Sequence, residues 1–164
     1  MKRSATLRLS SRQSRALLKG IAGLAALAGA NTLVALWTER RHPPRGAFVT
    51  VGGVRLHYTD RGEGPAVVLI HGNAVTGEDW DTSGVAGILV RTHRVIIFDR
   101  PGFGHSTRPR GASWTAAQQA DVIHEALFGL GVERPVVVGH SWGAMVALAL
   151  AQRYQSDVAA LVLL

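Results

Sequence analysis

A long apolar stretch near the start of the chain dominates its hydrophobic pattern. Residues 16–37, ALLKGIAGLAALAGANTLVALW, carry a single charge, on Lys19, whose ammonium can extend toward lipid headgroups. About 22 helical residues at about 1.5 Å each are long enough to cross a hydrocarbon core of about 30 Å. The pattern predicts an N-terminal hydrophobic helix, with residues 20–38 as a transmembrane anchor or signal segment.

The apolar period changes after a short linker expected at residues 39–46. Residues 47–51 and 55–59 are β-rich and flank Gly52-Gly53, which is typical of a hairpin. Four further apolar runs are continuous, as expected of strands buried on both faces. They comprise residues 66–70, 94–98, 135–138 and 158–164.

Helix-sized segments lie between these runs. Residues 114–130, with Ser113 as the expected N-cap, bring apolar side chains to one helical face. These side chains are Ala120, Ile123, Leu127 and Leu130. Residues 142–154 predict a second helix and residues 80–91 contain a third, weaker one. The alternation predicts an α/β domain over residues 47–164, with a mostly parallel sheet and helices on both faces.

The charge of the chain is concentrated at its start. The net charge is +7, and six positive charges with no acid among them precede residue 20. The rest is therefore nearly neutral, which argues against a nucleic-acid partner. The chain has no cysteine, which excludes disulfides, thiolate metal sites and a cysteine nucleophile. No metal site is expected, and the sequence does not indicate an oligomeric state.

The basic segment, residues 1–19, bears on the orientation of the hydrophobic helix. Positive charges before an apolar helix favour a cytoplasmic N-terminus, which places the following domain on the non-cytoplasmic side. A cleaved signal peptide is the alternative, with Ala28-Gly29-Ala30 as the cleavage site, and would make the protein secreted or periplasmic. The apolar run continues well beyond that site, which favours an anchor. The evenness of the run disfavours a peripheral amphipathic helix.

A candidate nucleophile lies in Gly139-His140-Ser141-Trp142-Gly143, a G-x-S-x-G pattern. The pattern directly follows a predicted strand and opens a predicted helix, which is the context of a nucleophile elbow. In such a turn Ser141 has a strained backbone, and the glycines at 139 and 143 avoid clashes with the neighbouring strand and helix. The alternative is a surface serine in a glycine-rich turn.

A second candidate element, Ile70-His71-Gly72-Asn73, ends the first buried strand. Acyl transfer needs two donors aimed at the oxyanion, and the backbone N–H groups of Asn73 and Trp142 suit that role. Gly72 permits close approach. We expect His71 to shape this loop rather than to act as the base, and His140 to be held in the elbow with its ring away from the Ser141 hydroxyl.

The chain resembles the α/β-hydrolase superfamily in three motifs taken together. They are HGN at 71–73, DRPGFGHS at 99–106 and GHSWG at 139–143. The resemblance runs from about residue 48 to the end of the chain. It implies that Asp99 braces a loop and is not the acid of the catalytic triad. It also implies that the acid and the histidine of the triad follow the nucleophile along the chain.

Within the superfamily, Asn73 and Trp142 resemble residues that hold a halide or an oxyanion in the haloalkane dehalogenase and luciferase branch. The nucleophile of those dehalogenases is an aspartate, whereas position 141 is serine. A serine ether could not be hydrolysed at a carbonyl carbon, so dehalogenation and epoxide opening are not expected. The residues favour hydrolysis of a small ester-like or other acyl substrate, without a cofactor.

The chain after Ser141 has one acid, Asp157, and no histidine. Asp157 precedes an apolar run and is interpreted as a loop residue. We therefore expect an N-terminal fragment that lacks the triad acid and histidine and is inactive by itself. Two alternatives stay open: a cofactor-free enzyme of another class, such as a haloperoxidase-like perhydrolase or a dioxygenase, and a non-catalytic binding member of the fold.

Overall fold

The computed structural model describes residues 11–111 and 113–164, so the first basic residues of the chain lie outside the described part. Contacts divide the chain into two units, residues 1–43 and 44–164. The described part of the first unit contains one helix, α1 (Ser11–Arg41). The helix continues to residue 41, so the extended linker is shorter than the predicted 39–46.

Helix α1 has the length and composition of a membrane span. Its apolar part, Arg15–Thr38, has 24 residues with a mean hydropathy of 1.6, and none of that part is buried within the structure. The hydroxyls of Thr32 and Thr38 each donate to the carbonyl four residues earlier, at 2.9 Å. These two polar side chains are therefore satisfied within the helix, as an apolar surrounding requires. A signal sequence would share these properties.

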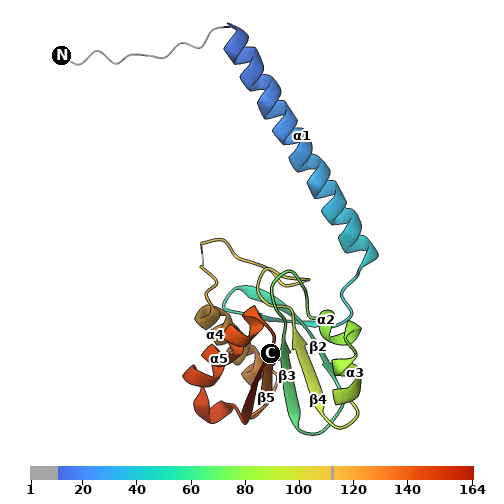
Figure 1. Ribbon diagram of the computed structural model, residues 1–164, viewed down its shortest axis with the longest axis vertical. Helices are drawn as coiled ribbons and strands as arrows, with labels where there is room; N and C mark the ends of the chain where they lie inside the picture. Colours follow the sequence, from blue (N-terminus) through green and yellow to red (C-terminus); the bar gives the residue numbers. More distant parts are fainter. Residues whose placement is uncertain (1–10, 112) are drawn as a thin grey trace, which may run out of the picture. The chain divides into compact units, whose positions relative to one another are not determined.

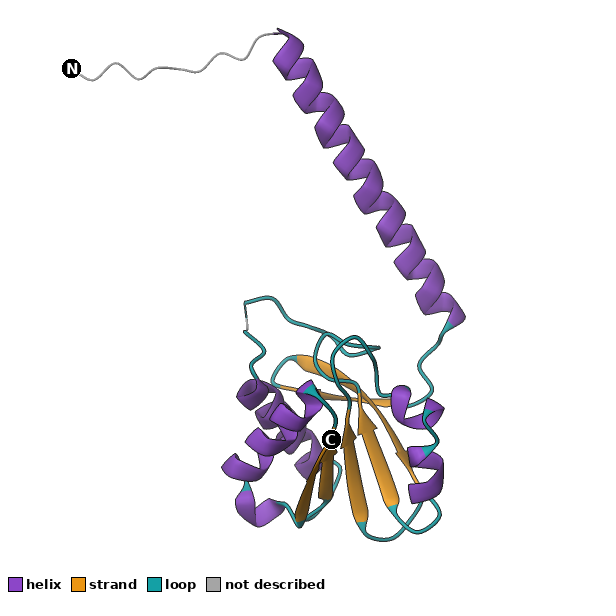
Figure 2. Cartoon of the chain, viewed as in Figure 1, coloured by secondary structure: helices purple, strands orange, loops and turns teal. Residues whose placement is uncertain are grey.

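The second unit is an α/β domain, as predicted (Figures 1 and 2). Its six-stranded sheet has the order β1-β2-β4-β3-β5-β6. Strands β1 and β2 form an antiparallel hairpin, β2 is antiparallel to β4, and the remaining neighbours are parallel. The strands are β1 (Ala47–Val51), β2 (Val54–Arg61), β3 (Ala66–Ile70), β4 (Arg94–Phe98), β5 (Val136–Gly139) and β6 (Ala160–Leu163). The hairpin turns at Gly52 and Gly53, whose φ angles of 54° and 78° match the turn that the glycine pair predicts.

Helices cover both faces of the sheet, which explains the continuous apolar strands (Figure 1). Val68 and Ile70 of β3 pack in the cluster beneath α4 (Ala116–Gly129) and α5 (Trp142–Arg153). The alternate residues of β3, Val67 and Leu69, pack with Trp80 and Ala86 on the other face. That face carries two short helices, α2 (Asp79–Thr82) and α3 (Val85–Leu89), where the sequence indicated one weak helix. A short 3-10 helix, η1 (Gln155–Asp157), follows α5.

The predicted start of α4 was wrong. The N-cap is Thr115, not Ser113, and the helix begins at Ala116. The Thr115 hydroxyl accepts from the backbone N–H of Gln118, and the Gln118 side chain accepts from the backbone N–H of Thr115. This reciprocal pair satisfies two backbone donors that a cap at Ser113 would leave open, so it determines where the helix begins.

Candidate active site

Ser141 occupies a sharp corner between the end of β5 and the start of α5. Its φ of 53° and ψ of −120° lie in a backbone region that residues with a side chain rarely adopt. Such a conformation costs on the order of 1–3 kcal/mol and persists only where surrounding contacts hold it. Here the Ser141 N–H donates to the carbonyl of Leu164 at 2.8 Å, and the His140 N–H donates to that of Ile70 at 3.0 Å. The Ser141 side chain is left exposed at the corner.

The two glycines of the pattern allow the strand and the helix to meet at this corner. A methyl group on Gly139 would lie 2.6 Å from Cα of Ala144, and one on Gly143 would lie 2.5 Å from the carbonyl oxygen of His71. Both distances are far shorter than a carbon contact of about 3.5–4.0 Å. Any side chain at either position would push β5, α5 and the end of β3 apart.

The loop after β3 lies directly against the corner. A methyl group on Gly72 would stand 3.1 Å from Cβ of Ser141, so the backbone at residue 72 is a close neighbour of that side chain. The hydrogen bonds among the described residues leave the backbone N–H groups of Asn73 and Trp142 without an acceptor. The structure thus brings together the predicted nucleophile and the loop that carries a predicted donor.

His71 is buried and uses both ring nitrogens within the loop. Its Nδ1 lies 2.8 Å from the carbonyl oxygen of Gly72 and donates to it, while Nε2 accepts from the backbone N–H of Arg100 at 2.9 Å. Burial lowers the pKa of His71 to about 4, so the ring is neutral at physiological pH. This geometry suits the predicted loop-shaping role and leaves no ring nitrogen for the Ser141 hydroxyl.

Asp99 follows β4 and holds three segments together. One carboxylate oxygen lies 2.9 Å from Nδ1 of His57 and accepts from the backbone N–H of His105 at 3.0 Å. The other oxygen accepts from the backbone N–H of Gly77 at 2.8 Å. Burial by itself would raise the pKa of Asp99, but these hydrogen bonds outweigh burial and hold the pKa below its usual range.

Sequence reasoning missed His57 as the partner of Asp99, since a lone histidine on a hairpin strand carries no signal of its own. It also missed Arg100, which is fully buried. Burial lowers the pKa of Arg100 to about 10, so the guanidinium stays charged at neutral pH. The motif DRPGFGHS at residues 99–106 includes Arg100, but the sequence predicted a role only for its aspartate, Asp99.

A relay to Ser141 is incomplete in the described part of the chain. No histidine ring or carboxylate in residues 11–111 and 113–164 forms a hydrogen bond with the Ser141 hydroxyl. The ring of His140 packs edge-on against Trp80, with centroids 6.5 Å apart. The described part of the chain also contains no group of three or more His, Asp or Glu side chains that could hold a metal ion.

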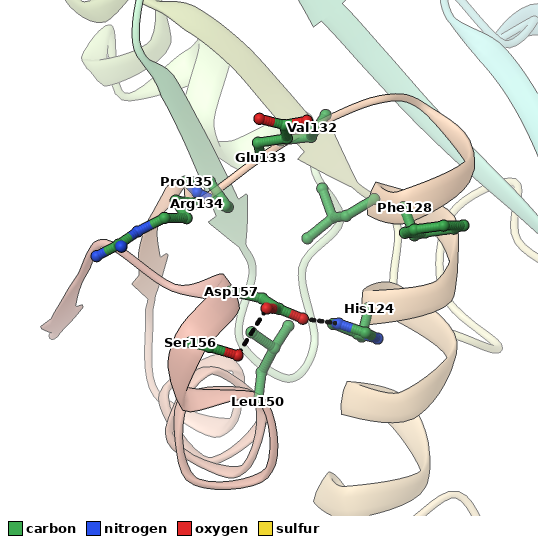
Figure 3. A pocket seen from close by; sticks show the side chains of 10 residues that line it. His124, Phe128, Val132, Glu133, Arg134, Pro135, Leu150, Ser156 and Asp157 are labelled. Atoms are coloured by element: carbon green, nitrogen blue, oxygen red, sulfur yellow. Dashed lines mark hydrogen bonds and ion pairs between the residues drawn. The ribbon is translucent and has the colours of Figure 1, made fainter.

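A pocket of about 350 Å³ is lined in part by residues 133–135, which directly precede β5 (Figure 3). Ser141 follows the other end of this strand. The lining of the pocket combines aliphatic side chains with His124, Ser156 and Asp157. Nε2 of His124 lies 2.8 Å from a carboxylate oxygen of Asp157, and the Ser156 hydroxyl donates to the other oxygen at 2.8 Å. The serine is therefore paired with the acid rather than with the histidine, so this trio cannot activate a nucleophile.

A family model for the alpha/beta hydrolase fold matches residues 65–164. The chain belongs to this family. The α/β-hydrolase domain is also 34% identical over 125 residues to 2-hydroxymuconate semialdehyde hydrolase of Pseudomonas putida, with 76% of this chain and 44% of that protein covered. The chain spans between about a third and a half of the length of the curated relatives that it matches.

Solved structures agree with this assignment. Est816, an enzyme that degrades N-acyl homoserine lactones, is 30% identical with a TM-score of 0.66, and the match covers 72% of this chain and 44% of that one. A bacterial membrane phospholipase A is 29% identical with a TM-score of 0.68, over 92% of this chain and 51% of that one. Residues 44–164 make up about three quarters of this chain, so the second match extends into α1. Epoxide hydrolases are also among the similar structures.

Proposed function

We propose that the protein is a serine hydrolase in which Ser141 attacks the carbonyl carbon of an ester-like or other acyl substrate. The observation that carries the proposal is the strained corner at Ser141, with the loop at Gly72 directly against its side chain. In this proposal, the unpaired backbone N–H groups of Asn73 and Trp142 donate hydrogen bonds to the oxyanion that the attack creates. The start of α5 adds a positive dipole end at the same place.

The reaction needs a base for the Ser141 proton and an acid to orient the base. None of the described histidines reaches Ser141, and the relatives extend well beyond the matched region. We place the histidine and the acid in that further region of the intact protein. His71 and Asp99 retain structural roles in this scheme, because their polar atoms are already bound within the loops.

Serine at position 141 separates acyl chemistry from the other reactions of similar folds. Epoxide or haloalkane opening through a covalent intermediate needs a carboxylate, whose ester can be hydrolysed at its own carbonyl. Attack by Ser141 on an alkyl carbon would leave an ether without such a carbonyl. Attack on an acyl carbon gives an ester that water can cleave, which favours this class of substrate.

We place the protein in a membrane-anchored arrangement, because α1 is long and apolar enough to span a membrane. The positive charges before residue 20 favour a hydrolase domain on the non-cytoplasmic side. A cleaved signal would give a secreted or periplasmic enzyme instead. The match to a membrane phospholipase A across 92% of this chain favours a lipid acyl ester as a second candidate substrate. Hydrolysis of phosphatidylcholine in mixed micelles, compared with hydrolysis of a short soluble ester, distinguishes the two substrates.

The experiment for the nucleophile is covalent labelling of the intact protein with a fluorophosphonate probe. We expect labelling of the native protein and its loss in Ser141→Ala. A matched control is Ser156→Ala, which removes an exposed serine hydroxyl near the start of β5 and should label normally. Absence of labelling in the native protein, or labelling that persists in Ser141→Ala, would refute the assignment.

A further inference from the structure

Arg100 is a buried positive charge without a carboxylate partner. Its side chain has 0% exposed surface, and no acid of the described chain forms an ion pair with it. The guanidinium carbon lies 4.3 Å from the ring centroid of Phe103, and Nη1 donates to Oε1 of Gln119 at 3.0 Å. Burying an unpaired charge is unfavourable, and a neutral side chain could fill the same space. The acceptors that Nη2 binds therefore indicate why a charged side chain occupies this position.

Both bonds of Nη2 fall on the loop beside Ser141, whereas the buried Nε has no hydrogen-bond partner among the described residues. Nη2 of Arg100 donates to the carbonyl oxygen of Gly72 at 2.9 Å and to Oδ1 of Asn73 at 2.7 Å. The backbone N–H of Arg100 donates to the ring of His71, and that ring donates to the same Gly72 carbonyl at 2.8 Å. One carbonyl oxygen thus accepts two hydrogen bonds, one of them from a cation.

The Gly72 carbonyl and the Asn73 N–H belong to the same peptide group. This peptide is trans, so the two bonds point in opposite directions from a rigid plane. Holding the carbonyl against Arg100 and His71 fixes the direction of the N–H, which no described acceptor uses. Hydrogen bonds to one end of an amide also polarise its other end, which makes the N–H a stronger donor.

We propose that Arg100 is a positioning residue for the oxyanion site, because it aims and polarises the Gly72–Asn73 peptide. The inference rests on the proposed function of Ser141 and adds a residue that acts through the peptide rather than on the substrate. This role explains why an arginine is buried here. The planar guanidinium donates to Gly72, Asn73 and Gln119 at the same time, which neither a neutral side chain nor a lysine can do.

The kinetic test compares Arg100→Met and Arg100→Lys in the intact protein with the matched control Arg94→Met. Arg94 pairs with Asp60 in the β2–β4 part of the sheet, so its loss affects stability without touching the loop at Gly72. Removing one oxyanion donor outright lowers kcat by about 10²–10³-fold. Since Arg100→Met weakens a donor rather than removes it, we expect kcat to fall by about 10–100-fold.

The pattern of kinetic constants separates positioning from general loss of structure. For Arg100→Met we expect a KM close to that of the native protein, and an affinity for a trifluoromethyl ketone that falls in parallel with kcat/KM, because its adduct carries the oxyanion. Arg100→Lys should lie between the native protein and Arg100→Met. A native kcat in folded Arg100→Met, or an equal fall of kcat in Arg94→Met, would overturn the proposal. If Arg100→Met does not fold, Arg100→Lys decides: a lowered kcat supports the proposal and a native kcat contradicts it.

A second readout does not depend on activity. The amide proton of Asn73, followed by NMR, should move upfield and exchange faster with solvent in Arg100→Lys, because its peptide is less polarised and less fixed. An unmoved resonance would contradict the positioning role. If Ser141→Ala keeps full activity while the Asn73 amide still responds to Arg100, the proposed nucleophile is wrong and the hold of Arg100 on the peptide stands.

Discussion

Replacing Gly72 by alanine adds one methyl group where the loop after β3 lies close to the nucleophile corner. The new methyl would lie 3.1 Å from Cβ of Ser141, 3.1 Å from Nδ1 of His140 and 3.2 Å from the carbonyl oxygen of His140. The φ angle of Gly72 is not in the left-handed region, so the effect is one of space and not of backbone strain. The loop and the corner must separate by a few tenths of an ångström.

The size of the effect on stability and on kcat/KM follows from the displacement of the loop relative to Ser141. Overpacking of this kind lowers the free energy of unfolding by about 1–3 kcal/mol. Displacement of a reacting group by about 1 Å costs about 10²-fold in rate. A shift of a few tenths of an ångström between Ser141 and the Gly72–Asn73 peptide should therefore lower kcat/KM by about 10-fold.

The assay is steady-state hydrolysis of a soluble acyl ester by the intact protein, together with urea unfolding. The matched control is Gly87→Ala in α3, where a methyl group would meet nothing within 4 Å. That change should raise the free energy of unfolding by up to about 1 kcal/mol and leave kcat/KM unchanged. A native kcat/KM in Gly72→Ala would refute the close approach of this loop to the reacting serine.

Three further predictions concern stability and the extent of the active chain. Thr115→Ala should lower the free energy of unfolding by about 1 kcal/mol in urea, because it removes the cap of α4. Burial lowers the pKa of His71 to about 4, whereas a histidine in the unfolded chain has a pKa of about 6.5. As the pH falls, the unfolded chain therefore binds this proton first, and the free energy of unfolding should decrease by about 3 kcal/mol between pH 7 and pH 4. His71→Gln should flatten that decline. The 164-residue chain alone should show negligible ester hydrolysis; turnover that depends on Ser141 in this chain would contradict the placement of the relay outside it.

The elements that could be predicted from the sequence are those whose bounds depend on a single physical property, such as burial. Strands β3 and β4 were predicted at their observed bounds, because burial on both faces leaves a continuous apolar run, which in β4 follows Arg94. The start of α4 was not, because Ser113 and Thr115 both suit an N-cap and only the side chain of Gln118 decides between them. That residue lies in the sequence as a T-x-x-Q pattern and could have been used.

The candidate site divides in the same way. The turn at Ser141 and the close approach at Gly72 were predicted from local motifs, since each restricts the residues at its position. The contacts of Asp99 with His57 and of Arg100 with Gln119 join residues 42 and 19 positions apart. Such pairs arise from the packing of strands and helices, and a single sequence has no local pattern that identifies them.

Trapping of the acyl-enzyme tests the central claim most directly. The intact protein is mixed with an activated ester, quenched in acid during the first turnovers, digested, and its peptides are weighed by mass spectrometry. The account predicts an acyl group on Ser141 that disappears with time as water cleaves the ester. An acyl group on a different residue, or continued turnover of Ser141→Ala at the native rate, would contradict it.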